Sequence, residues 1–145
     1  MNGITSDLDL KKLAKQLNIK LNGIYFKDEL PHIPIAGNYI INLASESDNN
    51  GGTHWLSAIL TKENEIKKAI YFDPFGIAEP ILINKFLLKW VDNNHNHIIR
   101  NKVDIQNLNS NWCGEYVMAF IGTINRSNGS LEQRLNNYIS EFRKY

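Results

Sequence analysis

The chain contains a single cysteine, Cys113, at the point where the polar residues SNW give way to the apolar run CGEYVMAFIGTI. A lone cysteine is often a small core residue, and that interpretation stays open. If Ser110 or Asn111 caps a helix here, the thiol lies in the first turn, where unpaired N–H groups and the helix dipole favour the thiolate. The thiolate is the reactive form, and Gly114 leaves space for a substrate, so the position suits a nucleophile.

A thiol nucleophile needs a general base, and one of the four histidines is well placed. His54 follows two glycines and begins a predicted strand, which would hold its ring while the glycines leave space around it. A histidine at a hairpin end, with its ring in water, explains the same position equally well. His32 lies in a loop between prolines, and the pair His95 and His97 is more typical of a polar surface turn than of a metal site.

Acyl transfer also needs a group that orients the imidazole and donors for the oxyanion. Asp73, in YFDPFG, ends the next predicted strand, although Asp-Pro is also a common turn opener. If the two strands pair as neighbours, we expect His54 and Asp73 to meet only through a bend at Pro74 or a non-adjacent pairing. Gln106, in VDIQNLN, and the Cys113 N–H are candidate oxyanion donors, although a glutamine alone is a weak signal.

The elements that must position these side chains follow from apolar periodicity and turn residues. Helices are expected after Ser6, over 79–94 with Leu82, Phe86 and Trp90 on one face, over 113–124 at the centre of the fold, and after Ser130, which forms a capping box with Gln133. Strands are expected over 37–44, 54–60 and 68–73 and within 97–106, whereas 21–34 is expected to be irregular. The fold class is therefore α+β, with a central mixed or antiparallel sheet packed with helices, in a single domain over 1–145.

Composition limits the classes of function. With 145 residues, 43% of them hydrophobic, the chain can build one core, and its net charge of +1 does not indicate binding to nucleic acid or a membrane surface. One cysteine excludes an intrachain disulfide and a Cys-rich zinc site, so we expect no metal or other cofactor, and a reducing compartment. The chain has no signal-peptide pattern and no apolar run of ~20 residues, so we expect neither secretion nor membrane insertion.

Taken in order, GGTHW, YFDPFG, DIQ and SNWCGEYVMAF resemble the motifs of the adenovirus maturation protease (adenain) family and, more broadly, of the Ulp-type cysteine proteases that process ubiquitin-like modifiers. LNGIYFKDELP and GNYIINLAS look like the adenovirus enzymes too, so the resemblance covers nearly the whole chain. It implies an Ulp/adenain-like cysteine protease fold. It also implies that Cys113 is the nucleophile, His54 the general base, Asp73 its orienting acid, and Gln106 with the Cys113 N–H the oxyanion hole.

The resemblance implies peptide-bond hydrolysis through a thioester, next to glycine in Gly-Gly or Gly-X sites. The expected substrates are capsid or other structural precursors of a virus or a virus-like element such as a virophage. We expect a monomer acting in the virion and in the host cytoplasm or nucleus. Two features depart from the adenovirus pattern. Those enzymes usually carry Glu where this chain has Asp73, and the absence of a second cysteine means that any peptide or DNA activator acts without a disulfide tether.

Three other functions stay open: a deconjugating protease for ubiquitin-like modifiers, an acetyltransferase of the same fold, and a non-enzymatic binding module. The acetyltransferases depend on extra elements for cofactor and activator binding, for which a chain of 145 residues has little room. A binding module would not need competent residue types at all four catalytic positions. The protease is therefore the favoured interpretation.

Overall fold

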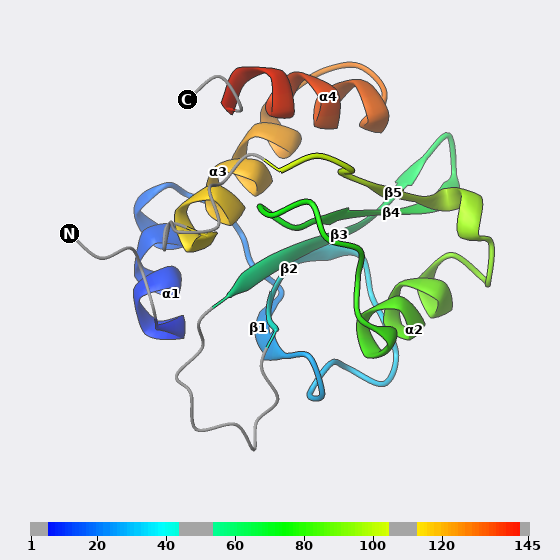
Figure 1. Ribbon diagram of the computed structural model, residues 1–145, viewed down its shortest axis with the longest axis horizontal. Helices are drawn as coiled ribbons and strands as arrows, with labels where there is room; N and C mark the ends of the chain where they lie inside the picture. Colours follow the sequence, from blue (N-terminus) through cyan, green and yellow to red (C-terminus); the bar gives the residue numbers. More distant parts are fainter. Residues whose placement is uncertain (1–5, 44–53, 105–112, 143–145) are drawn as a thin grey trace.

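A single mixed sheet forms the middle of the molecule in the computed structural model, which describes residues 6–43, 54–104 and 113–142 (Figure 1). Its five strands lie side by side in the order of the sequence: β1 (Gly23–Phe26), β2 (Gly37–Asn42), β3 (Trp55–Glu63), β4 (Ile66–Phe72) and β5 (Ile98–Arg100). The central strand β3 is antiparallel to both of its neighbours, β2 and β4, whereas β1 is parallel to β2 and β5 is parallel to β4.

Helices cover both faces of this sheet (Figure 1). One face carries α1 (Asp7–Gln16), α3 (Cys113–Arg126) and α4 (Leu131–Phe142), and the other carries α2 (Ile81–Trp90). Two of the helix starts follow the predicted caps. Ser6 Oγ accepts the N–H of Asp9 at 3.1 Å, and Ser130 and Gln133 bond each other's backbone N–H groups at 3.1 and 3.3 Å. Within the described residues, no helix is both long and apolar enough to cross a lipid bilayer.

The pleat of the sheet divides the core into two layers, because alternate side chains of a strand point to opposite faces. Ile40, Ile59 and Phe72 pack against α1, α3 and α4, while Tyr39 and Tyr71 pack against α2. The helix that begins at Cys113 lies in the first layer and buries most of its side chains, as its nearly uninterrupted apolar sequence predicted. The α+β fold class is thus confirmed.

The tight turn between β3 and β4 determines which residues lie side by side at the opposite end of these two strands. Asn64 and Glu65 have φ of 53° and 67°, the left-handed backbone of a two-residue hairpin turn, and both strands run further toward it than predicted. The register pairs Ser57 with Phe72, so the start of β3 lies beside the end of β4. The expectation that His54 and Asp73 meet only through a bend at Pro74 or a non-adjacent pairing was wrong, because the start of one strand and the end of its antiparallel neighbour lie at the same end of the sheet.

Three other predictions need correction. The stretch 21–34 is not wholly irregular, because Gly23–Phe26 forms β1 along the free side of β2. Leu82 is 42% exposed, and α2 instead buries Ile83 and Leu87 together with the predicted Phe86 and Trp90. Of the stretch 97–106, the strand β5 takes only Ile98–Arg100, and 105–112 lies outside the described residues.

Candidate active site

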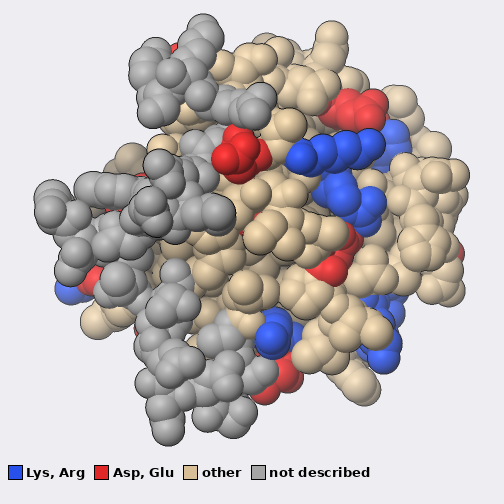
Figure 2. All heavy atoms as spheres, in the orientation of Figure 1, with Lys and Arg blue, Asp and Glu red and all other residues tan. Residues whose placement is uncertain are grey.

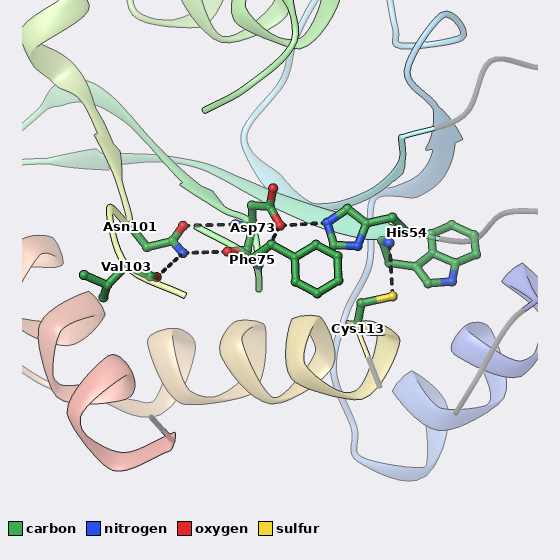
Figure 3. A network of polar contacts seen from close by, with 7 residues as sticks. His54, Asp73, Phe75, Asn101, Val103 and Cys113 are labelled. Carbon is green, nitrogen blue, oxygen red and sulfur yellow. Dashed lines mark hydrogen bonds and ion pairs between the residues drawn. The ribbon is translucent and has the colours of Figure 1, made fainter. Parts of the chain in front are cut away.

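A buried histidine and a buried aspartate face each other where β3 begins and β4 ends. His54 immediately precedes β3 and Asp73 immediately follows β4, and the two residues are 7% and 3% exposed. The His54 Nε2 and Asp73 Oδ1 atoms are 2.7 Å apart (Figure 3). Because a carboxylate can only accept, Nε2 carries a proton and donates a hydrogen bond to Asp73. The other ring nitrogen, Nδ1, does not take part in this bond.

The turn Asp73–Gly76 holds the aspartate in place. The Asp73 Oδ1 atom also accepts the N–H of Phe75 at 2.8 Å, and the Asp73 carbonyl accepts the N–H of Gly76 at 2.8 Å. Gly76 has a φ of +72°, and a Cβ at this position would lie 2.7 Å from the backbone of Val103, so both conformation and space require glycine here. The Phe75 ring then stacks on the His54 ring, with centroids 4.3 Å apart and planes 3° from parallel.

The cysteine is brought to the same site by α3, the helix that packs on β3. Cys113 is the first described residue of α3, and its sulfur accepts the backbone N–H of Trp55 at 3.4 Å (Figure 3). Trp55 follows His54 in the chain, so this contact ties the thiol to the strand that carries the histidine. The first N–H groups of a helix lack intrahelical partners, and they present partial positive charge to a sulfur at this position.

The pKa of His54 depends on its burial and on two neighbours, Asp73 and Cys113. Burial alone would lower the pKa of His54, but the hydrogen bond to Asp73, the adjoining Cys113 sulfur and the negative charge that each can carry outweigh burial and raise the pKa to about 9. Nδ1 is buried, and besides Asp73 the group that favours the protonated ring is Cys113. The imidazole is thus held as a cation near neutral pH, beside the thiol.

This raised pKa predicts a pH-dependent stability. A group with an ordinary pKa of 6.5 when unfolded and about 9 when folded stabilises the fold fully below 6.5, and its contribution is lost as the pH rises through 9. We therefore expect the free energy of unfolding, measured by urea denaturation, to fall between these two pH values. In Asp73→Asn, which removes the negative charge, the fall should be much smaller. The same fall in both proteins would contradict the assignment of the His54–Asp73 pair.

The other residues considered from the sequence lie outside the described residues or at the surface. Gln106 lies outside the described residues, as do Ser110 and Asn111, so the predicted second oxyanion donor and the helix cap stay predictions. His32 and His95 are exposed, and His97 lies in a short 3₁₀ turn beside Asn94, as expected for a polar surface turn. In the described parts of the chain, no group of three or more His, Cys, Asp or Glu side chains is arranged to hold a metal ion.

Sequence reasoning missed two residues that the structure places at this site. Phe75 was treated only as part of the DPFG turn, yet its ring covers His54. Asn101 was passed over, yet its side chain bonds the backbone of Asp73 (Figure 3). The available signal for Asn101 was weak: a single amide that follows the apolar residues of a predicted strand, in a chain rich in asparagine.

Comparisons with known proteins bear on the fold. No family model matches the sequence, and no curated protein matches it. Among solved structures, the crystal structure of the ASFV pS273R protease superposes with a TM-score of 0.54 at 13% identity, covering 97% of this chain and 66% of that chain. This chain therefore spans just under two thirds of the length of that protein. The likeness shows that this chain shares its fold with that viral protease, and it does not single out the adenovirus enzymes.

Proposed function

We propose that this protein is a cysteine endopeptidase of viral type, in which Cys113, His54 and Asp73 form the catalytic triad. The observation that carries the proposal is the 2.7 Å bond from His54 to Asp73, on a ring that lies beside the only cysteine of the chain. A buried carboxylate that orients the imidazole and stabilises its cation, next to a thiol at a helix start, is the arrangement that thiol proteases require.

In the proposed reaction, the Cys113 thiolate attacks the carbonyl carbon of the scissile bond. Negative charge then moves to the carbonyl oxygen, which the Cys113 N–H and the Gln106 amide would stabilise. The His54 imidazolium gives its proton to the departing amine, which leaves a thioester on Cys113. Neutral His54 next takes a proton from water, hydroxide attacks the thioester, and the thiolate leaves as the carboxylic acid forms.

The proposed substrates are polypeptide precursors cleaved next to glycine, in Gly-Gly or Gly-X sites, such as the capsid precursors of a virus or virus-like element. This specificity rests on the resemblance to adenain and the Ulp-type enzymes. A peptide or DNA activator would have to bind without a disulfide, because Cys113 is the only cysteine. Acidic and basic side chains are interspersed on the face shown in Figure 2, and the net charge is +1, so neither favours a strong dependence on DNA.

Peptides with an aliphatic residue before Gly-Gly-X, and matched peptides with Ala-Ala-X, test the proposal by mass spectrometry. We expect cleavage of the glycine peptides only. Faster cleavage of a folded ubiquitin-like precursor than of any short peptide would instead favour a deconjugating protease. Transfer of label from acetyl-CoA to protein, with no peptide hydrolysed, would favour the acetyltransferase and overturn the proposal.

The Gln106→Ala variant tests the second oxyanion donor. Removal of one such donor lowers kcat by roughly 10²- to 10³-fold, because the charge on the oxygen develops only in the transition state. We expect this loss in steady-state peptide cleavage, with KM nearly unchanged. Gln16→Ala, at the exposed end of α1, is the matched control and should leave the rate unaltered. A loss of less than about tenfold in Gln106→Ala would show that another group stabilises the oxyanion.

A further inference from the structure

Asn101 lies just beyond the end of the pairing between β4 and β5, close to the candidate site. It directly follows β5, and only 5% of its surface is exposed. The parallel strands β4 and β5 run in register as far as the pair Tyr71 and Arg100. Asn101 therefore follows the last paired residue of β5, and Asp73 comes two residues after the last paired residue of β4.

The carboxamide of Asn101 bonds both backbone groups of Asp73. Its Oδ1 atom accepts the Asp73 N–H at 3.0 Å, and its Nδ2 atom donates to the Asp73 carbonyl at 2.6 Å (Figure 3). Nδ2 also donates to the Val103 carbonyl at 3.1 Å. The orientation of the amide follows from its partners, because an N–H can only donate and a carbonyl can only accept.

These bonds leave Asp73 little freedom. Its N–H and carbonyl are tied to one buried side chain, its carbonyl also accepts the N–H of Gly76, and its Oδ1 accepts the N–H of Phe75. Fixing the peptide units on both sides of a residue fixes the direction of its Cα–Cβ bond. The direction of the Asp73 carboxylate, and with it the bond to His54, thus depends on Asn101.

We propose that Asn101 is a positioning residue, which uses both atoms of its amide to hold the backbone of Asp73 and so directs the carboxylate at His54. The inference rests on the proposed function, in which Asp73 orients the general base. Asn101 acts through Asp73 and is not itself a catalytic residue. Its side chain bonds the Asp73 backbone just beyond the last pair of β4 and β5, where the sheet pairing no longer holds it.

Two substitutions remove the hydrogen bonds of the Asn101 side chain in different ways. Asn101→Asp keeps the shape and one acceptor, but an ionised carboxylate cannot donate to the Asp73 and Val103 carbonyls and adds negative charge beside Asp73. Asn101→Ala removes all three bonds. Ser57→Ala is the matched control, because Ser57 is fully buried in the same sheet and its hydroxyl donates to the Tyr39 carbonyl at 3.0 Å and not to His54 or Asp73.

The test measures His54 directly, so it needs no knowledge of the substrate. The NMR titration of His54 should have a midpoint near 9 in the native protein and should move toward 6.5 in Asn101→Ala, whereas the added negative charge of Asn101→Asp itself favours protonated His54, so that variant is judged by the alkylation rate alone. The rate of Cys113 alkylation by iodoacetamide at neutral pH should fall about ten- to a hundred-fold, the size of effect that misplacing a catalytic group produces. Ser57→Ala should lower the melting temperature and leave both quantities unchanged.

The outcomes separate this inference from the proposed function. A folded Asn101→Ala variant, with native circular dichroism but a lower melting temperature, that keeps the native His54 midpoint and alkylation rate would make Asn101 merely structural and overturn the inference. Asp73→Asn supplies the reference. If it shifts the His54 midpoint while Asn101→Ala does not, the positioning role alone fails. If Asp73→Asn leaves the midpoint unchanged as well, the triad itself fails.

Discussion

Cys113→Ala should abolish peptide cleavage, with a loss in kcat of about 10⁶-fold, the size seen when the nucleophile of a hydrolytic triad is removed. The expected loss is large because Cys113 is the only thiol in the chain, so no second cysteine can replace it. Cleavage of the Gly-Gly-X peptides, followed by chromatography over hours, measures the residual rate.

The fold should survive this substitution. Alanine is the strongest helix former, and Cys113 begins α3, so the change suits the local structure. The variant loses the contact from the Trp55 N–H to the sulfur, which we expect to cost about 1 kcal/mol of stability. A circular dichroism spectrum equal to that of the native protein serves as the control. Cleavage at more than a few per cent of the native rate, in a folded Cys113→Ala protein, would refute the assignment of the nucleophile.

His54→Ala should lower kcat by at least about 10⁴-fold, because the variant has neither the base that deprotonates the thiol nor the acid that protonates the leaving amine. It should also slow the alkylation of Cys113. An unperturbed thiol reacts mainly near pH ~8.5, whereas a thiolate stabilised by a neighbouring imidazolium reacts well below that pH. We therefore expect rapid alkylation by iodoacetamide at pH ~6 in the native protein and alkylation at least about tenfold slower in His54→Ala.

The matched control for His54→Ala is His32→Ala, which removes an exposed histidine of a loop. It should leave both the cleavage rate and the alkylation rate at native values. Equal alkylation rates at pH ~6 in the native protein and in His54→Ala would contradict a functional pair. Slow alkylation in both proteins that becomes fast when a candidate viral peptide or DNA is added would indicate that an activator completes the site.

The Phe75 ring gives the histidine a second support besides Asp73. Stacked on the His54 ring at 4.3 Å, it covers one face of the imidazole and limits the access of water to it. The same residue donates its backbone N–H to Asp73 Oδ1, so the acid, its turn and the cover over the base come from one short stretch, Asp73–Gly76. The burial of this charged pair is explained because the buried Asp73 carboxylate accepts hydrogen bonds from both the His54 ring and the Phe75 N–H.

Local sequence signals predicted much of the fold. Ser6, Ser130 and Gln133 identified two helix starts, because a side-chain oxygen three residues before a free N–H is a local interaction that needs no tertiary contact. The apolar run after Cys113 predicted a buried helix for the same kind of reason. The strand β1 was missed because its four residues are only half-buried, so pairing with β2, and not its own periodicity, defines it.

For the candidate site, residue types made His54, Asp73, Gln106 and Cys113 candidates with alternatives left open, and the resemblance of their motifs, in order, to the adenain and Ulp-type families singled them out as a set; Gln106 stays a prediction. Only the tertiary structure decided how three of them meet. The hairpin at Asn64 and Glu65 brings the start of β3 beside the end of β4, and the packing of α3 on β3 brings the thiol to the Trp55 N–H. Asn101 could be found only there, because its bonds to Asp73 join residues 28 positions apart, and such contacts leave no periodic pattern in a sequence.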